Sequence, residues 1–463
     1  MARLTQLLDR EDEMAMLDRA WEQAAHERPQ LAVVWGRRRV GKTFLLSHFT
    51  QHRRAVFFGA TQQAETVELA RLADATRRDL GDRATDLAGG RFASWEAALR
   101  FFAALASEEP LVVVLDEVPY LAGSTRGFAS VVQAVWDHLP VDNKLMLVLT
   151  GSAIAMMETM VGAGGALRGR PTLTLKLGPL GPIEAHAFLP RLKPDAFIEA
   201  YAACGGYPLH LREWDETATT DTNLVRLAAT PGGILLEDAA GMLAEELPQA
   251  GGYARILAAI GRGRTRFGEI AAESEQRVER PLEILTRAGL IAKVTPVGAP
   301  KGARASYEIA DPYVAFWFSV LYSDISQIGA GQGVAVIHRR RAEWQRRLGA
   351  VFEDAARAHA ARLVVRGILP EDTVVGRWWA IRGEPCEVDV LGLRGSRTAL
   401  LGEAHWQRGA LGRRDLEQLK RKTTLVPRPV EEPLYVLWGR GGVEKGVAQE
   451  NVLGFGPEDM LAR

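Results

Sequence analysis

The sequence predicts an α/β fold that is built around a parallel sheet and followed by further domains. Over residues 1–178, short apolar runs alternate with stretches of amphipathic helical pattern, which is typical of a parallel sheet covered by helices. The runs are unbroken because the strands of such a sheet are buried on both faces. A length of 463 residues exceeds one ordinary domain, so several are expected. We place four strands at residues 31–35, 55–58, 111–115 and 145–149.

A loop bounded by two glycines follows the first strand and ends in Lys-Thr, directly before a helical pattern. Strand, loop, Lys-Thr and helix together are the context that a phosphate-binding P-loop needs. The glycines let backbone N–H groups turn toward phosphate oxygens, and the helix N-terminus adds positive potential. Lys42 is then expected to reach the β- and γ-phosphates, and the Thr43 hydroxyl to ligate Mg²⁺. The residues expected to bind nucleotide here are Gly36, Arg37, Arg38, Arg39, Val40, Gly41, Lys42 and Thr43.

Two carboxylates follow the strand at 111–115, at the edge where an open α/β sheet binds its ligands. Asp116 is expected to hold Mg²⁺ through water, and Glu117 to orient and deprotonate the water that attacks the γ-phosphate. After the strand at 145–149, the Ser152 hydroxyl is expected to contact that water or the phosphate. A further cation on the developing charge is expected from Arg168 or Arg170, within the subunit or from a neighbour.

Two further domains follow the sheet. Residues 179–250 are helical and punctuated by Gly and Pro, which we interpret as a lid of packed helices. Residues 251–320 show three helical segments and then two strands around a Gly/Pro/Lys loop, the order of a winged helix-turn-helix. A basic linker over 321–347 is expected to join these domains to a last α/β domain at 348–463.

The third of these helices is expected at about residues 277–288, and the two strands with their loop form the wing. The charges of this helix and of the wing leave two roles open for the winged helix. Arginines of the helix and cations of the wing would contact DNA, whereas glutamates of the same helix would repel phosphate. Winged helices also bind proteins, so DNA binding and a protein–protein role both remain open here. The helix arginines are Arg277, Arg280 and Arg287, the wing cations Lys293, Lys301 and Arg304, and the glutamates Glu275, Glu279 and Glu283.

Acidic side chains alternate along two expected strands of the last domain. Glu387 and Asp389 project from one face of the first strand, and Glu403 and His405 from one face of the next. If the strands pair, the carboxylates repel one another unless a cation binds or a pKa rises. Oxygen ligands suit Mg²⁺ or Mn²⁺, so Asp389 and Glu403 are the expected ligands. Glu353, from the preceding helix, would add a further carboxylate.

Together these motifs resemble the archaeal-type ATPase family, which is related to the AAA+ and STAND P-loop ATPases. Residues 8–13 are similar to the family's opening segment, with Leu8 in place of an aromatic residue. The P-loop, residues 116–121 and residues 150–152 match the family pattern, and residues 311–318 are similar to the "D-P-x-x-x-F-W-F" that closes its winged helix. The resemblance covers most of the chain.

The resemblance implies ATP and Mg²⁺ as cofactors and assigns three further residues. It implies that Arg10 lies near the adenine. Arg170 aligns with the arginine of a "Y-G-R" stretch, in which Arg168 replaces the tyrosine, so Arg170 is the expected catalytic cation. Pro208 belongs to a Gly-Tyr-Pro sequence that resembles the G-x-P element which brings the lid to the nucleotide in STAND-type ATPases.

The last segment resembles the uncharacterised domain often attached to these ATPases, which is itself similar to PD-(D/E)xK nucleases. A restriction-endonuclease-like α/β domain with Asp389, Glu403 and His405 in its active site is implied. His405 departs from that pattern, because nucleases have a lysine there that activates the attacking water, and a histidine is a poorer cation near neutral pH. Lys420 or Lys422 of the next helix is the alternative source of this cation. Otherwise the domain is an inactive nuclease fold used in binding or assembly.

Composition narrows the functional classes. A formal net charge of zero neither indicates nor excludes nucleic acid as a partner. Cys204 and Cys386 are too few for a disulfide framework or a zinc site and fit a reducing cytoplasm. No apolar run approaches the roughly 20 residues that cross a bilayer, so no membrane partner is expected.

We therefore expect a cytoplasmic, ATP-hydrolysing switch that acts on DNA through its winged helix and nuclease-like domain. An arginine that acts across subunits would require an ATP-dependent homo-oligomer. Two alternatives remain open. One is a metal-dependent nuclease gated by ATP, and the other is a STAND-like oligomeric scaffold with an inactive nuclease fold.

Overall fold

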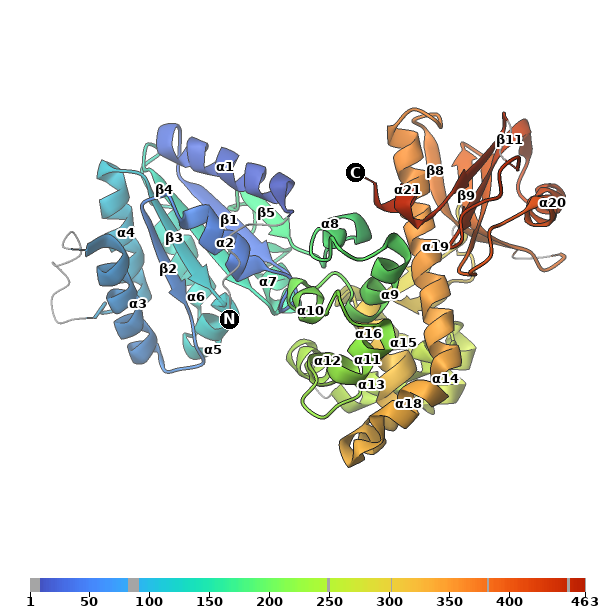
Figure 1. Ribbon diagram of the computed structural model, residues 1–463. Helices are drawn as coiled ribbons and strands as arrows, with labels where there is room; N and C mark the ends of the chain where they lie inside the picture. The colour runs from blue at the N-terminus through green and yellow to red at the C-terminus, as the bar shows by residue number, and fades with distance from the viewer. Residues whose placement is uncertain are drawn as a thin grey trace. The chain divides into compact units, whose positions relative to one another are not determined.

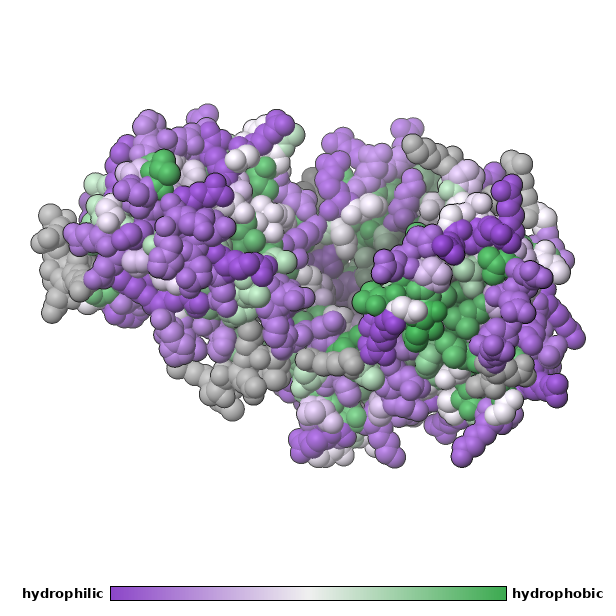
Figure 2. Space-filling model, turned by 90° about the horizontal axis from the view of Figure 1, so that it is seen from above, coloured by the Kyte–Doolittle hydropathy of each residue, from purple (hydrophilic) through white to green (hydrophobic). Residues whose placement is uncertain are grey.

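The computed structural model describes residues 9–81, 91–247, 250–300, 302–380, 383–447 and 450–462. Leu8 and Lys301, which carry parts of the motifs above, lie outside these residues. The chain divides into two compact units, Met1–Pro179 and Leu180–Arg463 (Figure 1). Within the described ranges no helix has the length and apolarity to cross a membrane. Figure 2 shows mostly hydrophilic side chains over the visible surface of the first unit.

The first unit is an α/β core around a five-stranded parallel sheet, as predicted (Figure 1). The strand order is β2-β3-β4-β1-β5. Every residue of β1, β3 and β4 is buried, which explains their unbroken apolar sequences. The strands are β1 (Gln30–Trp35), β2 (Ala55–Gly59), β3 (Leu111–Asp116), β4 (Leu145–Gly151) and β5 (Leu173–Lys176).

Helices cover both faces of this sheet. Alternate residues of strands β1–β4 face one large apolar core, in which the rings of Trp95 and Phe128 meet edge to face at 5.2 Å. The Trp95 indole also donates a hydrogen bond to the Thr125 hydroxyl at 3.1 Å, so its one polar atom is satisfied. The helices are α1 (Glu11–His26), α2 (Lys42–Thr50), α3 (Glu65–Leu80), α4 (Trp95–Glu108), α5 (Val118–Ser124), α6 (Phe128–Trp136) and α7 (Ile154–Val161).

The strand order decides where the polar loops meet. Strand β4 lies between β1 and β3, and all three run parallel. Trp35 of β1 is in register with Gly151 of β4, and Leu115 of β3 with Leu149 of β4. The loops that follow these three strands therefore lie side by side at the carboxyl edge of the sheet, where open α/β sheets bind ligands.

The second unit begins with helices over the residues expected to form a lid. Three of them carry proline in the first turn, where its missing N–H costs no hydrogen bond. Three more helices and an antiparallel hairpin follow, with Ile291 paired to Ile309. The elements are α8 (Pro182–His186), α9 (Pro194–Cys204), α10 (Pro208–Glu213), α11 (Thr220–Ala228), α12 (Ile234–Glu246), α13 (Ala250–Gly261), α14 (Phe267–Ser274), α15 (Glu279–Arg287), β6 (Ile291–Val294) and β7 (Ser306–Ile309).

Two motifs that lie about a hundred residues apart in the sequence meet in the core of this unit. The Tyr207 hydroxyl donates to the Asp311 carboxylate at 2.6 Å, and Asp311 in turn caps α16 (Pro312–Phe316) by accepting from the Val314 amide. Gly206 is required beside them, because a Cβ there would lie 1.8 Å from the Leu180 carbonyl oxygen. Pro208 begins α10, and its expected part in nucleotide binding stays a prediction.

The segment expected as a basic linker is helical instead. The two arginines Arg339 and Arg340 both pair with Asp324, at 2.9 and 2.6 Å. The boundary placed at residue 347 falls inside the 25-residue helix α19, whose apolar side chains, Trp344 and Leu348 among them, are buried across that boundary. The elements are η3 (Trp317–Leu321), η4 (Tyr322–Asp324), α17 (Ile325–Gln327), η5 (Ile328–Gln332), α18 (Gly333–Arg339) and α19 (Arg341–Val365).

The chain ends in a mixed five-stranded sheet of order β12-β11-β10-β9-β8, against which α19 packs (Figure 1). Strands β8, β9 and β10 are antiparallel neighbours, and β10, β11 and β12 are parallel. The elements are β8 (Thr373–Trp379), β9 (Glu387–Arg394), β10 (Arg397–His405), α20 (Arg413–Arg421), η6 (Lys422–Thr424), β11 (Pro429–Gly439), β12 (Val452–Phe455) and α21 (Pro457–Leu461).

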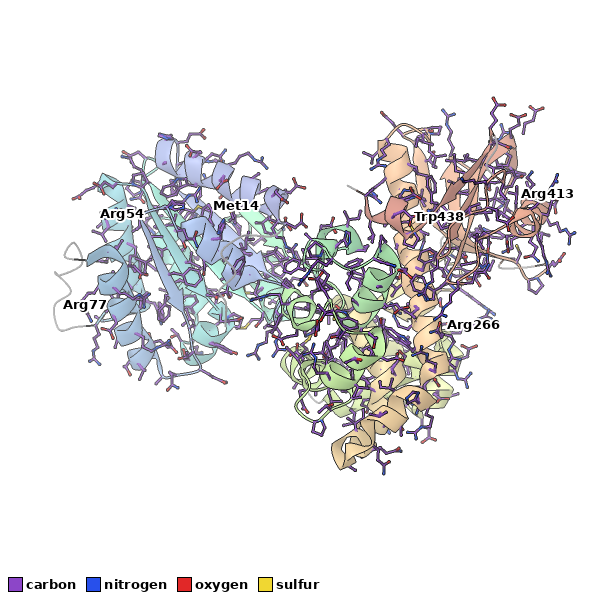
Figure 3. The ribbon with its side chains drawn as sticks, in the orientation of Figure 1. Met14, Arg54, Arg77, Arg266, Arg413 and Trp438 are labelled. Carbon is purple, nitrogen blue, oxygen red and sulfur yellow. The ribbon has the colours of Figure 1, made fainter. Side chains whose placement is uncertain are left out.

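Trp438 fixes α19 to this sheet (Figure 3). Its indole N–H donates to Nδ1 of His359 on α19 at 3.1 Å, and both side chains are buried. Burial lowers the pKa of His359 to about 4, so the ring is neutral and able to accept. The Trp438 ring lies over Gly402, where a Cβ would be 2.4 Å from ring atom Cζ3.

Candidate functional site

The P-loop forms the predicted strand–loop–helix turn. Gly41 ends the loop with a φ of 97°, a left-handed conformation that favours glycine, and α2 begins at Lys42. The Lys42 side chain is only 4% exposed. Its ammonium donates to the carbonyl oxygens of Gly36 and Arg37, at 2.8 and 3.0 Å. The loop is thus wrapped around the one cation that the sequence assigned to the phosphates.

Gly36 and Arg10 join this loop to its surroundings. A Cβ at Gly36 would lie 2.1 Å from the Leu177 carbonyl oxygen, so only glycine fits beside the end of β5. The Arg10 guanidinium donates to the carbonyl oxygens of Gly178 and Val40, at 2.6 and 3.4 Å. Arg10 therefore links the segment before α1 to the P-loop, and its expected place near an adenine stays a prediction.

Thr43 and Asp116 meet across the site. The Thr43 hydroxyl donates to the Asp116 carboxylate at 2.7 Å, and Asp116 is 5% exposed. Burial raises the pKa of Asp116, while the Thr43 hydrogen bond and the Lys42 charge act in the opposite direction. A hydroxyl and a buried carboxylate side by side are the hard oxygen donors that Mg²⁺ prefers, so these residues fit the ion that they were expected to hold.

Glu117 is held by Ser152 at the same edge of the sheet. Its backbone is left-handed, with a φ of 57°, directly before α5. Its carboxylate oxygen Oε2 accepts from both the amide and the hydroxyl of Ser152, at 3.1 and 2.9 Å. The structure thus brings these two predicted residues together, although the contact between them was not predicted. The signal available in the sequence was that each follows a strand of the same parallel sheet.

Arg170 and Arg168 do not share this edge. They precede β5, which runs parallel to β1, so they lie at the amino edge of the sheet. The Arg170 guanidinium pairs with both oxygens of Asp137, each at 2.7 Å, and also donates to the Ala166 and Arg168 carbonyl oxygens. This geometry favours the second of the two expected possibilities, action on a neighbouring subunit, and the role of Arg170 as the catalytic cation stays a prediction. The Arg168 side chain is exposed and makes no ion pair within the described part of the chain.

The predicted acidic residues of the last domain come together where β9 and β10 pair. Asp389 accepts a hydrogen bond from the Ala404 amide at 3.0 Å. Glu403 is buried and lies 3.8 Å from Nε2 of His405, which confirms that the two share a strand face. Lys422, at the start of the turn η6, donates to the Glu403 carboxylate at 2.6 Å. Of the two lysines considered, Lys422 is therefore the one that reaches the acidic residues.

Glu353 of α19 completes this group, which we call the carboxylate cluster: Glu353, Asp389 and Glu403. Burial, and then the charge of Asp389, raises the pKa of Glu353 to about 8 and that of Glu403 to about 7. The rise in pKa is one of the two outcomes expected for converging carboxylates. The other was a bound cation. Among the described residues no group of three or more His, Cys, Asp or Glu is placed to hold a metal ion, so a cation at Asp389 and Glu403 would need further ligands from outside these side chains.

Arg357 belongs to this site and was missed. It lies one helical turn after Glu353, 3.8 Å from its carboxylate, and donates to the Asp389 carbonyl oxygen at 2.9 Å. The spacing of four residues between a glutamate and an arginine on one helix was the signal that pointed to it. Glu387, by contrast, turns away to pair with Arg377 at 2.7 Å.

Comparisons with known proteins find a relative of similar length and a solved structure of similar fold. The chain is 27% identical over 449 residues to an uncharacterized protein of Methanocaldococcus jannaschii, covering 94% of this chain and 95% of that one. The fold of the present chain is similar to that of a Walker-type ATPase of Pyrococcus abyssi. The TM-score is 0.51, with 21% identity, and the match covers 67% of this chain and 96% of the other.

Two family models match separate parts of the chain. Residues 317–421 match a family of archaeal and bacterial proteins of unknown function, which spans α19 and the strands of the carboxylate cluster. Residues 7–214 match the model of an ATPase domain predominantly from Archaea. The P-loop, Asp116 and Glu117 all lie within this match, so residues 7–214 of this chain are similar to ATPase domains that occur predominantly in Archaea.

Proposed function

We propose that this chain is a switch that hydrolyses Mg·ATP in its first unit and acts on DNA through its second. The observation that carries the proposal is the meeting of Lys42, the Thr43–Asp116 pair and Glu117 at one edge of the sheet. A domain that bound nucleotide without hydrolysing it would need only the Lys42 ammonium and the Thr43 hydroxyl. A carboxylate in reach of the same edge is the additional group that hydrolysis requires.

Each of these residues has a defined task in the reaction. The Lys42 ammonium exchanges its two carbonyl partners for phosphate oxygens. Thr43 and Asp116 hold the magnesium ion that accompanies ATP and neutralises charge on the phosphates. Glu117 orients the attacking water and takes its proton. Because Ser152 holds the Glu117 carboxylate with two hydrogen bonds, Glu117 must exchange at least one of them for the water before it acts as base.

The cation on the developing charge comes from a second copy of the chain. Both candidate arginines lie at the amino edge of the sheet, and Arg168 is the exposed one. Arg168 of one subunit therefore acts on the nucleotide of its neighbour, which makes activity depend on an ATP-bound oligomer.

The second unit supplies the parts that act on DNA. Helices α13–α15 and the hairpin β6–β7 have the element order of a winged helix, and the mixed sheet with its carboxylate cluster is the part whose sequence resembles a nuclease. Helix α19 contacts both η3, which follows the winged helix, and strands β8–β10. A movement of one of these parts is thus passed to the other through α19.

The test is turnover and nucleotide binding by the full chain. Lys42→Ala is expected to lose ATP binding, and Glu117→Gln to bind ATP but hydrolyse it about 10²- to 10⁴-fold more slowly. Glu96→Gln removes the same charge from an exposed helix site of the same unit and serves as the matched control. Wild-type turnover in Glu117→Gln, or in Lys42→Ala, would refute the assignment.

A second candidate function is metal-dependent DNA cleavage, favoured by the reach of Lys422 to Glu403. Lys422 supplies the cation that His405 cannot, so cleavage is expected with Mg²⁺ or Mn²⁺ on linear or supercoiled DNA. Asp389→Ala and Lys422→Ala should abolish it. Lys420→Ala is the control, because Lys420 lies over the Tyr435 ring instead of the carboxylates. No cleavage by wild type, together with ATP-dependent oligomers, would favour the scaffold with an inactive nuclease fold.

A further inference from the structure

Two adjoining cavities of the second unit lie between the hairpin β6–β7 and the start of the C-terminal sheet. Their volumes are about 680 and 410 Å³, and they share Arg266, Ser306, Trp379 and Ala380 in their walls. Figure 3 shows Arg266 at the turn before α14, below the C-terminal sheet in that view. We call the joined cavities the wing groove, defined by Arg266, Phe267, Lys293, Arg304, Tyr307 and Trp379.

The wing groove carries unneutralised positive charge. Arg266, Lys293 and Arg304 are exposed and form no ion pair with the residues that the structure describes. The one acidic residue in the wall of the larger cavity, Glu269, accepts a hydrogen bond from the Arg266 amide at 3.2 Å. Three cations against one carboxylate leave a net positive wall, which attracts a polyanion.

Aromatic side chains stand among these cations. The Phe267 side chain is 42% exposed, an unusual position for a ring of this size on the surface of a helix. Tyr307 and Trp379 are partly exposed in the same wall. Rings interleaved with cations in a concave surface are the arrangement that takes bases by stacking and phosphates by charge.

The smaller cavity adjoins a third one of about 240 Å³, with which it shares Thr265, Glu308 and Arg377, and Glu353 of the carboxylate cluster lines that third cavity. Cys386 and Glu387 line the smaller cavity, and the Glu387 carbonyl oxygen accepts from Lys422, which also holds Glu403. Arg377 pairs with the carboxylates of both Glu308 and Glu387, so one guanidinium offsets part of the negative charge along this path. A strand bound in the wing groove would therefore extend toward the cluster past carboxylates that are already ion-paired.

We propose that the wing groove binds single-stranded nucleic acid and delivers it to the carboxylate cluster. Single strands are favoured over duplex because a base must leave its stack before it can lie on Phe267, Tyr307 or Trp379. The helix expected to read duplex DNA, α15, carries no comparable excess of positive charge, since exposed glutamates accompany its arginines. The inference rests on the proposed function only in giving the nuclease-like sheet its substrate, because the binding itself needs no ATP.

The test is fluorescence anisotropy of the full chain with a labelled oligo-dT of about 20 nucleotides, an oligo-U of the same length and a matched duplex. Phe267→Ala should weaken single-strand binding about 5- to 100-fold, the loss of one stacked base, while Phe267→Trp should retain it. The double change Lys293→Ala and Arg304→Ala should lower the slope of log affinity against log salt by about 1.4. Arg280→Ala with Arg287→Ala removes the same charge from α15 and distinguishes the two surfaces, because single-strand affinity should fall less in this variant than in the groove variant.

Several results would overturn the inference. They are a duplex bound as tightly as the single strands, no binding at low salt, unchanged affinity in Phe267→Ala, or an equal loss in the α15 control. Tighter binding of oligo-dT than of oligo-U would identify DNA as the ligand, and the reverse RNA. Lys42→Ala is measured in parallel. Groove binding that persists in Lys42→Ala supports the inference even if the ATPase proposal fails.

Discussion

Replacement of Arg168 by alanine is expected to abolish the ATP hydrolysis that depends on oligomers, in which Arg168 of one subunit contacts the nucleotide of its neighbour. The P-loop follows the carboxyl end of β1, a strand of six residues, whereas Arg168 precedes the parallel strand β5. Two ends of such a strand are about 20 Å apart. Over that distance, more than two Debye lengths at physiological ionic strength, an exposed charge is screened and has almost no effect on the γ-phosphate of its own subunit.

Across a subunit interface the same side chain would contact the phosphate directly. An arginine in that position accelerates phosphoryl transfer about 10³- to 10⁵-fold, so Arg168→Ala should lose at least about 10³-fold in turnover at protein concentrations where the chain is oligomeric. At dilutions where wild type is monomeric, the two proteins should hydrolyse ATP equally slowly. Arg170→Ala is the comparison, because Arg170 is already bound to Asp137 and its loss is expected to affect folding of the first unit instead.

The assay is steady-state turnover against protein concentration, with light scattering on the same samples. A mixture of Arg168→Ala and Lys42→Ala adds a decisive measurement. The first retains a working nucleotide site and the second retains Arg168, so mixed oligomers should recover part of the activity that neither has alone. Wild-type turnover in Arg168→Ala at every concentration, or a loss that is independent of concentration, would refute the reasoning.

Three further predictions follow from single contacts. Glu117→Gln should accumulate bound ATP that is not turned over, which filter binding with labelled ATP measures; a variant that releases phosphate at the wild-type rate would contradict the role of base. Gly402→Ala places a Cβ 2.4 Å from the Trp438 ring and should destabilise the second unit by about 1 to 3 kcal/mol in urea unfolding, whereas an unchanged midpoint would show that the ring moves freely. The pKa of His359 is lowered to about 4 in the folded protein, so the unfolded chain binds this proton at a higher pH than the folded one. The contribution of neutral His359 to the free energy of unfolding should be fully present above about pH 6.5 and should fall by up to about 3 kcal/mol toward pH 4. His359→Gln should remove that part of the pH dependence.

The strands of the first unit could be predicted where burial on both faces requires an unbroken run of apolar residues. Four unbroken apolar runs correspond to β1–β4. Strand β5 (Leu173–Lys176) was missed, because it pairs only with β1 at the edge of the sheet and Leu175 is its one buried residue. An edge strand of this kind has no apolar run to find.

The parts of the candidate nucleotide site could be located in the sequence because they are short motifs at strand ends, and their role in binding stays a prediction. The contacts between those parts could not be predicted in this way. Arg10 reaches Gly178 across 168 positions, and the Ser152–Glu117 contact depends on the strand order. The position of Arg170 at the amino edge of the sheet also follows only from β5, the strand that was missed.

In the second unit, the alternation of residues along a strand predicted the structure well, whereas the run of basic residues did not. Alternation along β10 placed Glu403 and His405 on one face, as the structure has them. The arginines of the expected linker suggested a solvated connector, because their partner, Asp324, lies at a distance in sequence that no local pattern shows. Which lysine reaches Glu403 was likewise decided by where α20 ends, one residue before Lys422.

The central claim is that ATP binds with magnesium in the loop around Lys42, and calorimetric titration of the full chain with a non-hydrolysable ATP analogue tests it most directly. The account predicts uptake of one equivalent by the wild type, dependent on Mg²⁺, and no uptake by a folded Lys42→Ala protein. Equal uptake by both proteins, or none by folded wild type in the presence of Mg²⁺, would contradict it.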